Sequence, residues 1–401
     1  MKYKYTTSIF TIVFVLFVSV MSIITPDKET SDLESRSLQV MPTIENLKEE
    51  DNSYRIRTHL KGLLDGEVFG KWDSYFSDHI YARNSAVNAY VAMQDILGQK
   101  YINGAYIAED EYIISPTEFV EKKESDLIGS AEHFNKIAAK FEESEIYVVN
   151  LPRKHMVYED KMPIPNYIAP ENSYIDTVLE NMDKNKINVL DTRSIMDSSK
   201  DLYYKTDHHW NMNGVYESYN YIISNMSSKF PQIGEPESKD MFDIKTYSSS
   251  FIGSDARKVG KLVDYADDIE VYNNKEFKKY KVLNKKGEIS LIKEELLTDN
   301  NPNNDYSAYL GGDNSELLIE NYDAKNDLKI VMIGDSMDNA LIPLMAPHFK
   351  ELYSFDQREY TGFKGNIDSI VSKINPDIIM FIGMSNNFID GENSSVFKWD
   401  I

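Results

Sequence analysis

From about residue 120 onward, the hydrophobic pattern alternates between strand-like and helix-like stretches. Short apolar runs predict strands at 146–151, 187–191, 328–333, 351–355 and 377–382, of which 146–151 and 328–333 are expected to be buried. Apolar residues at helical spacing predict helices at 128–141, 175–182, 213–226, 337–349 and 367–374. This alternation predicts an α/β fold in which a parallel sheet is flanked by helices as three layers, with the functional site in loops at the carboxyl ends of the strands.

Other parts of the chain depart from this alternation. Residues 54–97 carry apolar side chains at helical spacing, and a short hairpin is expected within 103–114. The segment 231–326 is rich in Lys, Asp and Asn, with short β-like runs. We interpret it as an insertion or a small β-rich lobe, so that the predicted catalytic domain comprises 54–230 and 327–401.

The N-terminus has the pattern of a membrane-targeting segment. Two lysines precede an uncharged stretch from Tyr5 to Pro26, and acidic residues follow it. The stretch is just long enough to span a bilayer, with its positive end in the cytoplasm and the remaining chain outside. Because no small-x-small cleavage site is evident before Thr25, we expect residues 1–26 to be an uncleaved signal anchor; the alternative is a removed signal peptide and a secreted protein. Residues 27–53 are polar, and we interpret them as an extracytoplasmic linker.

Composition narrows the function classes. The chain has 43 basic and 65 acidic residues, a formal charge of −22, which repels phosphate backbones and argues against nucleic acid as a partner. Neutral partners such as sugars fit better. The absence of cysteine excludes disulfides, thiolate catalysis and cysteine-ligated zinc.

The strongest candidate chemistry lies in two short stretches. In an extended segment, positions i and i+2 point the same way, so Asp207 and His209 can share a face while His208 points away. Ser336 follows a predicted buried strand and a glycine, which would put its hydroxyl at the carboxyl edge of the sheet. A serine, a histidine that takes its proton and a carboxylate that orients the histidine form a nucleophilic site.

These residues have alternative interpretations. Asp207, His208 and His209 could bind a metal, although neighbouring side chains diverge and the chain offers few further ligands. His209 could be a core histidine bonded to a carboxylate, and Ser336 could merely cap a helix. We favour the nucleophile and expect neither a metal nor a cofactor.

Further candidates surround this site. Gly334 supplies the turn before the serine, and Trp210 adjoins His209. Lys154 follows the end of the first strand and is a weaker candidate for substrate or oxyanion binding. Asp78 and Arg83 are better explained as a structural ion pair.

Two more candidates follow strand ends. Arg358 could bind a substrate oxygen or the developing oxyanion, or instead form a salt bridge with Asp356 or Glu359. The side-chain amide of Asn387 could donate to an oxyanion, or instead serve a turn.

Together these motifs resemble a known family. The tetrad Asp207-His208-His209-Trp210 is the pattern that names the DHHW proteins. More broadly, the chain resembles extracytoplasmic alginate-type O-acetyltransferases, a permuted branch of the SGNH (GDSL-like) hydrolase fold in which the Asp-x-His element precedes the serine. The remaining residues that carry the resemblance are Tyr75 to Asp78 with Arg83, Pro152 to Lys154 with Val157 and Tyr158, Gly334 to Ser336, and Asp356 to Arg358.

The resemblance implies an activity and partners. Ser336 would be the nucleophile, His209 the base and Asp207 its orienting carboxylate. In the relatives, a membrane-bound O-acyltransferase-type multispanning protein supplies acetyl, which is placed on a polysaccharide hydroxyl. The separate Gly and Asn oxyanion blocks of free SGNH esterases are not evident in this chain, and we expect no carbohydrate-binding module after the catalytic part. The alternatives are a carbohydrate acetyl esterase and a non-catalytic glycan-binding or scaffold protein of the same system.

Overall fold

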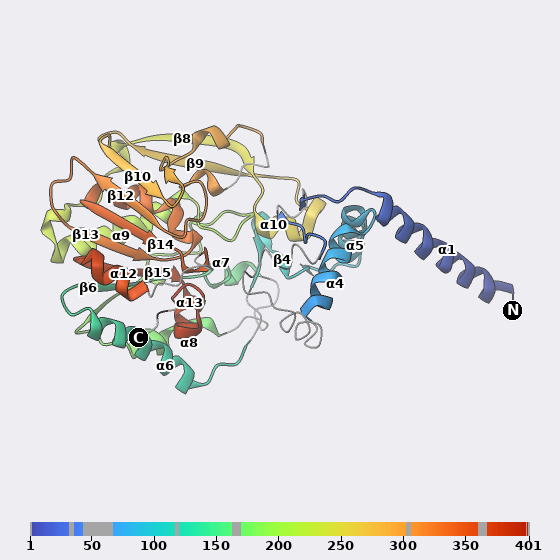
Figure 1. Cartoon of the computed structure of the whole chain (residues 1–401), viewed down its shortest axis with the longest axis horizontal. Coiled ribbons are helices and arrows are strands. Elements are labelled where there is room, and N and C mark those ends of the chain that lie inside the picture. Colours follow the sequence, from blue (N-terminus) through green and yellow to red (C-terminus); the bar gives the residue numbers. More distant parts are fainter. Residues whose placement is uncertain are drawn as a thin grey trace. The chain divides into compact units, whose positions relative to one another are not determined.

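The chain folds into two compact units, which are described separately. The computed structural model describes residues 2–31, 36–42, 67–116, 120–162, 170–301, 306–359, 367–397 and 399. The smaller unit contains Met1–Asn103 with Arg257–Asp264, and the larger contains Gly104–Ala256 with Tyr265–Ile401 (Figure 1). Much of the predicted linker, and the part of the helical region from 54 to 66, lie outside the described residues.

The larger unit is built on an eight-stranded sheet with the order β11-β10-β12-β14-β13-β15-β6-β7 (Figure 1). The five strands from β14 to β7 are parallel, as predicted. The strands β12, β10 and β11 continue the sheet in antiparallel order, so the sheet is mixed. Their bounds are β6 Glu145–Leu151, β7 Ile187–Asp191, β10 Tyr280–Asn284, β11 Gly287–Glu288, β12 Leu317–Asn321, β13 Lys329–Ile333, β14 Glu351–Phe355 and β15 Ile378–Met384.

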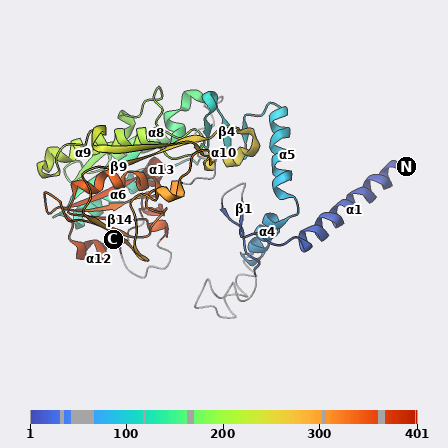
Figure 2. The ribbon, with the colours of Figure 1, turned by 90° about the horizontal axis from the view of Figure 1, so that it is seen from above.

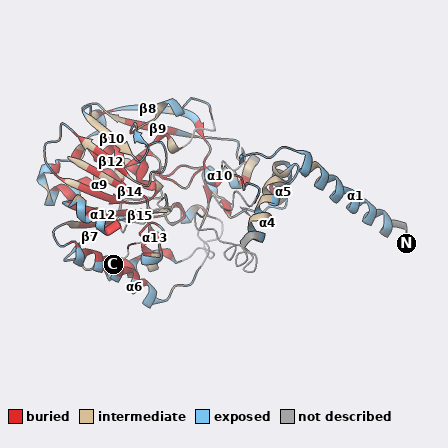
Figure 3. Cartoon of the chain, in the orientation of Figure 1, coloured by how far each residue is buried: buried red, intermediate tan, exposed pale blue. Residues whose placement is uncertain are grey.

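Alternate residues of the parallel strands enter two different cores, which produces the predicted three layers. On β15, Met380 and Ile382 join one core, whereas Ile379 and Phe381 join the other. The first core includes apolar residues of α9 and α11, and the second those of α6, α8, α12 and α13. Figures 2 and 3 show helices over the sheet and the buried positions concentrated on its strands. The helices are α6 Glu124–Lys140, α8 Glu171–Glu180, α9 Met212–Lys229, α11 Ile342–Met345, α12 Ile367–Ile374 and α13 Ser385–Asp390.

α9 begins at Met212, one residue before the predicted helix at 213–226. Asn211 is its N-cap, although Asn213 is an equally suitable residue type: the side-chain oxygen of Asn211 accepts hydrogen bonds from the backbone N–H groups of Asn213 and Gly214. Either asparagine has the right chemistry for a cap, so the sequence alone does not separate them.

The single helix predicted for 337–349 is also a correction. The structure has a 3₁₀ turn at Ser336–Ala340, the short α11, and another 3₁₀ turn at Ala346–His348. Pro343 and Pro347 lack the N–H that a continuous helix requires, which accounts for the interruption.

Smaller pairings complete the larger unit. β4 (Ala105–Ile107) pairs with β5 (Ile113–Ile114), which confirms the predicted hairpin. β8 (Phe242–Phe251) pairs with β9 (Asp267–Asn274) in a separate two-stranded sheet. The segment 231–326 therefore supplies strands both to this ribbon and to the main sheet.

The smaller unit contains the N-terminal helix and a helical pair. α1 (Lys2–Ile24) includes the stretch Tyr5–Ile24, which is long and apolar enough to cross a membrane by length and composition, with a mean hydropathy of 2.5 and no part buried in the protein (Figure 3). α4 (Glu67–His79) and α5 (Arg83–Ile96) are joined by a turn at 80–82.

Candidate active site

Ser336 stands at the end of β13, where the strand turns into a 3₁₀ helix. Among residues 330–346, all of which the structure describes, Ser336 is the one residue that is not buried. Gly334 makes this turn possible, because a Cβ at that position would lie 2.2 Å from Oδ2 of Asp338 and 3.0 Å from the carbonyl oxygen of Ile382. The hydroxyl is therefore reachable on an otherwise packed edge.

A buried carboxyl group fixes the shape of the turn. Oδ1 of Asp335 accepts the backbone N–H of Met337 at 3.0 Å, and its Oδ2 accepts the side-chain amide of Asn387 at 2.8 Å. Burial raises the pKa of Asp335. Asn387 thus reaches the rim, as predicted from its place after the last strand, but its amide is engaged with Asp335.

The two motifs meet at a serine–histidine–aspartate chain of hydrogen bonds. Oδ1 of Asp207 lies 2.5 Å from Nδ1 of His209, and Nε2 of His209 lies 2.9 Å from Oγ of Ser336. A carboxylate can only accept, so the proton on the ring belongs on Nδ1, which leaves Nε2 as an acceptor for the serine proton. This is the geometry that a general base and its nucleophile require.

Residues of the segment 231–326 contact Asp207 at Oδ2, the carboxylate oxygen that His209 does not use. The backbone N–H of Ser254 donates to Oδ2 of Asp207 at 2.6 Å, and Gly253 lies so close that a Cβ there would be 2.1 Å from the Asp207 Cβ. Burial by itself would raise the pKa of Asp207, but His208, His209 and these hydrogen bonds outweigh it and hold the pKa well below its usual value. The carboxylate is therefore ionised and oriented at neutral pH.

Lys154 is buried next to the backbone of Asp207 and does not lie in the open part of the site. Its side chain is 3% exposed, and Nζ donates to the carbonyl oxygens of Ile113, Lys205 and Asp207 at 2.5, 2.8 and 2.8 Å. Asp255 lies 3.5 Å from the same nitrogen. Burial lowers the pKa of Lys154, and the nearby carboxylates oppose that shift. All three ammonium protons are used within the protein, so the observed contacts of Lys154 are structural.

Two aromatic residues border the histidine. The indole N–H of Trp210 donates to the carbonyl oxygen of Met337 at 2.8 Å, which ties the DHHW stretch to the serine turn. Tyr306 stacks on the His209 imidazole, with ring centroids 4.0 Å apart and planes 12° from parallel. Trp210 is buried, so its side chain stabilises the site and is not available to contact a substrate.

A charged group lies next to the serine turn. Arg358 donates to both oxygens of Asp356 at 3.0 and 2.6 Å and to Asp313 at 3.1 Å. The structure thus contains the salt bridge to Asp356 that was the alternative to oxyanion binding.

Asp338 is a further buried carboxyl group near the serine turn. Burial first, and then the charges of Asp335 and Asp356, raise the pKa of Asp338 well above its usual value.

The predicted residues fall into two groups. Ser336, His209 and Asp207 come within hydrogen-bonding distance, with Gly334 shaping the turn. Trp210, Lys154, Asn387 and Arg358 surround them and are engaged with other protein groups. Sequence reasoning missed the contributions of 231–326, namely Gly253, Ser254, Tyr306 and Asp313. Nothing in one sequence separates Tyr306 from the other tyrosines of a chain that has 27.

The metal alternative can be tested against the donor atoms. Asp207, His208 and His209 each offer a ligand atom within 4.8 Å of the others, and within the described part of the chain they form the group with metal-like spacing. Both nitrogens of His209 and both oxygens of Asp207 already have protein partners, and Nδ1 of His208 lies 2.8 Å from Oγ of Ser254. A metal would have to replace these hydrogen bonds, so the donor set fits a proton-transfer site better.

Comparison with known families is consistent with this arrangement. Residues 172–355 match the model of the DHHW protein family. The resemblance predicted from the tetrad is thereby confirmed, and the DHHW match includes both the tetrad and Ser336. No curated protein matches the chain.

Two of the solved structures that match the chain share its fold at low sequence identity. PatB1 from Bacillus cereus, solved with a sulfonyl adduct, is 19% identical with a TM-score of 0.60, and the match covers 72% of this chain and 98% of PatB1. A DHHW family protein from Eubacterium siraeum is 17% identical with a TM-score of 0.57, covering 73% of this chain and 95% of its own. The O-acetyltransferase domain of AlgJ from Pseudomonas putida is more distant, with 11% identity, a TM-score of 0.41 and coverage of 71% and 92%.

Proposed function

We propose that this protein is an extracytoplasmic serine acyl-transfer enzyme that acts in O-acetylation of an exopolysaccharide or cell-surface glycan. The observation that carries the proposal is the continuous chain from Asp207 through His209 to Ser336, at 2.5 and 2.9 Å. Ser336 at its end is partly exposed, which a nucleophile must be and a structural cap need not be.

The chemistry follows from the proton positions. As Oγ of Ser336 attacks the acetyl carbonyl of a donor, its proton passes to Nε2 of His209 and then to the leaving group. A sugar hydroxyl next gives its proton to Nε2 and attacks the acyl-enzyme, which releases Ser336 with its proton restored. Asp207 keeps the imidazole in the correct tautomer and stabilises its charged form. General-base help of this kind contributes about 10²–10⁴-fold.

The negative charge that develops on the acetyl oxygen needs donors. The backbone N–H of Ser336 stands at the first position of its 3₁₀ helix, where N–H groups have no partner within the helix. Arg358 and Asn387 are the remaining oxyanion candidates, and either would have to leave its carboxylate partner to reach the substrate.

Location and partners form part of the proposal. A helix of the composition of α1, at the N-terminus and unburied, supports an anchor that keeps the catalytic unit outside the cytoplasm. An anchored transferase needs acetyl delivered through the membrane, so the partner we propose is a multispanning O-acyltransferase-type protein. The acidic surface favours an uncharged polysaccharide acceptor.

A serine-directed probe tests the nucleophile. An aryl sulfonyl fluoride should label the purified chain with loss of fluoride, and Ser336→Ala should abolish the label while Ser290→Ala, at an exposed control serine, should not. PatB1, which shares the fold, has been solved with a sulfonyl adduct, which supports this choice of reagent. Absence of labelling would favour the glycan-binding scaffold.

Product analysis separates transfer from hydrolysis. With an acetyl ester donor and an oligosaccharide present, a transferase yields acetylated sugar, whereas an esterase yields free acetate in equal amounts with or without the sugar. The second result would replace the transferase with a carbohydrate acetyl esterase acting through the same serine.

A further inference from the structure

The turn between α4 and α5 packs against the end of the N-terminal helix. The backbone N–H of Tyr81 donates to Oγ of Ser22 at 2.8 Å. The Tyr81 ring meets the ring of Phe17 edge-on, with centroids 6.0 Å apart. A second tie joins the chain after the helix to α4, because the hydroxyl of Tyr75 donates to Asp27 at 2.9 Å.

These contacts set the depth of the turn relative to the apolar helix. Ser22 and Phe17 lie two and seven residues before the end of α1 at Ile24. At 1.5 Å per residue, they stand about 3 and 10 Å inside that end. If Tyr5–Ile24 spans the bilayer, as proposed above, a group that contacts both must enter the outer leaflet. The inference rests on that part of the proposed function.

The turn is suited to such a position. Ile80 is 47% exposed and Tyr81 is 37% exposed, so both present apolar surface to their surroundings. Backbone polar groups inside a bilayer need partners. Ser22 accepts the N–H of Tyr81, and the carbonyl of Ile80 accepts the N–H of Arg83 at 3.2 Å. Tyrosine is also enriched at the depth where apolar chains meet head groups.

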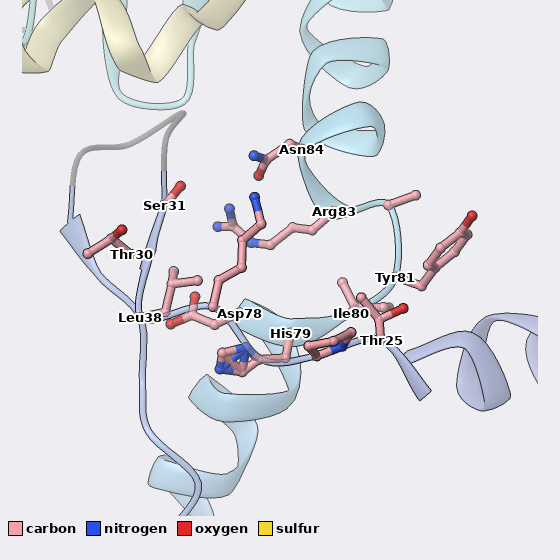
Figure 4. Close-up of a pocket in the computed structure, with 13 residues that line it drawn as sticks. Thr25, Thr30, Ser31, Leu38, Asp78, His79, Ile80, Tyr81, Arg83 and Asn84 are labelled. Atoms are coloured by element: carbon pink, nitrogen blue, oxygen red, sulfur yellow. The ribbon is translucent and has the colours of Figure 1, made fainter. Parts of the chain in front are cut away.

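A cavity of about 210 Å³ lies directly behind the turn, next to the end of α1 (Figure 4). Figure 4 shows Arg83 extending from the start of α5 into the cavity, whereas Tyr81 points away from it. The polar lining residues are Thr25, Lys28, Thr30, Ser31, Asp78, His79, Arg83 and Asn84.

The charge of this lining differs from that of the whole chain. Among the described residues that line the cavity, Lys28 and Arg83 are basic and Asp78 is acidic, so basic side chains outnumber carboxylates. Asp78 also accepts the backbone N–H of Gln39 at 2.8 Å. A chain of net charge −22 is repelled by an anionic membrane, so attraction to lipid phosphate requires a local basic site. This cavity has that chemistry, and Thr25 places it one residue beyond the apolar helix.

We propose that the α4–α5 turn is a second membrane contact: Ile80 and Tyr81 enter the outer leaflet beside α1, and the cavity behind them holds the phosphate of an anionic lipid head group. The protein is then held to the membrane at two points, which restricts how the helical pair can turn about the anchor.

Site-directed spin labelling tests the depth of the turn. The chain has no cysteine, so single cysteines can be introduced cleanly in the full-length protein in lipid nanodiscs. Labels at Phe14→Cys, in the anchor, and at Ile80→Cys and Tyr81→Cys should be relaxed by oxygen and protected from a water-soluble nickel chelate. A label at exposed Gln99→Cys, three residues beyond the far end of α5, should show the reverse.

The outcomes separate this inference from the anchor. Aqueous behaviour at both positions of the turn with lipid behaviour at position 14 overturns the second contact and leaves the anchor standing. Aqueous behaviour at position 14 refutes the anchor, and the second contact with it. The Tyr81→Cys change removes the ring that contacts Phe17 and could by itself release the turn from the membrane. The Ile80→Cys variant keeps that ring, so it reports the depth of the turn without this effect.

Lipid retention tests the cavity. In nanodiscs of mixed phosphatidylglycerol and phosphatidylcholine, native mass spectrometry should find phosphatidylglycerol enriched on the protein. Lys28→Gln with Arg83→Gln should reduce that preference about tenfold or more, because each basic residue near an anionic surface contributes about fivefold. Lys100→Gln is the matched control at an exposed lysine. Unchanged preference in the double variant overturns the phosphate assignment. Displacement of the lipid by inorganic phosphate assigns the cavity to free anions instead.

Discussion

Replacing Asp207 by asparagine probes the part of the site that the two motifs share with the segment 231–326. Three donors face this carboxylate: Nδ1 and the backbone N–H of His209, and the backbone N–H of Ser254. Asparagine is nearly isosteric but offers one acceptor oxygen and one NH₂ group. Whichever way the amide turns, at least one N–H donor then faces another donor.

The two amide orientations have different catalytic consequences. If NH₂ faces the ring, it donates to Nδ1 and moves the ring proton to Nε2, so that His209 can no longer accept the proton of Ser336. If the oxygen faces the ring, the N–H of Ser254 loses its acceptor and the imidazolium loses its counter-charge. The first outcome corresponds to the effect of this substitution in serine-protease triads, a fall of about 10⁴ in kcat. That is about 5.4 kcal/mol of transition-state stabilisation at 1.36 kcal/mol per tenfold.

Stability should change less than activity, and in a pH-dependent manner. Leaving a buried donor unsatisfied costs about 1–3 kcal/mol. Because the pKa of Asp207 in the folded protein is depressed below its ordinary value of 3.8, its stabilisation is present above that pH and is lost as the pH falls through the folded pKa. The native protein and Asp207→Asn should therefore differ most in free energy of unfolding near neutral pH and converge below about pH 4.

Turnover of p-nitrophenyl acetate and urea unfolding across pH measure both effects. Asp160→Asn, at an exposed carboxylate, is the control and should leave both unchanged. A kcat for Asp207→Asn within tenfold of native, in a preparation where Ser336→Ala is inactive, would refute the assigned role of Asp207. A stability difference that grows toward acid pH would refute the assigned direction of its pKa.

Three further substitutions test the surroundings of the site. Ser336→Ala should abolish acyl turnover and change the free energy of unfolding by no more than about 1 kcal/mol in urea titration, since it removes one hydrogen bond from a partly exposed side chain. Lys154→Met should destabilise by about 3–5 kcal/mol, because it leaves Asp255 buried without its counter-charge; adding Asp255→Asn should recover part of that loss, and an equal loss in single and double variants would contradict the pairing. Trp210→Phe should cost about 1–3 kcal/mol by orphaning the carbonyl of Met337, measured as a shift in the urea midpoint, and unchanged stability would show that the bond contributes nothing.

The sequence alone was sufficient to predict the elements and site residues whose placement depends on neighbouring positions in the chain. Buried strands such as β6 and β13 are short, largely apolar runs, so their positions follow from the residues themselves. Ser336 and the last strand could be placed on one rim because the carboxyl ends of parallel strands meet at one edge. The two-residue spacing of Asp207 and His209 indicated a shared face, and the structure joins them by a hydrogen bond.

The remainder depends on contacts between distant residues. Three strands of 231–326, β10, β11 and β12, extend the main sheet, which they join through the antiparallel pairing of β12 with β14. Their polar, irregular composition gives no indication that β14 is the strand they join. Ser254 acts through its backbone N–H, which every residue except proline has, so no side-chain pattern could reveal it. Tyr306 is defined by where the fold places its ring.

The order of these segments along the chain has a consequence for export. The carboxylate and imidazole are at 207–209, Ser254 and Tyr306 follow, and Ser336 comes just after β13, which lies beside β15, the last strand of the sheet along the chain. If the protein is exported as proposed, a chain still in a translocation channel carries the histidine without the hydroxyl that it would activate. The proposed acyl-transfer activity would then arise only once nearly the whole polypeptide has emerged, so esters in the cytoplasm would not meet a finished catalyst.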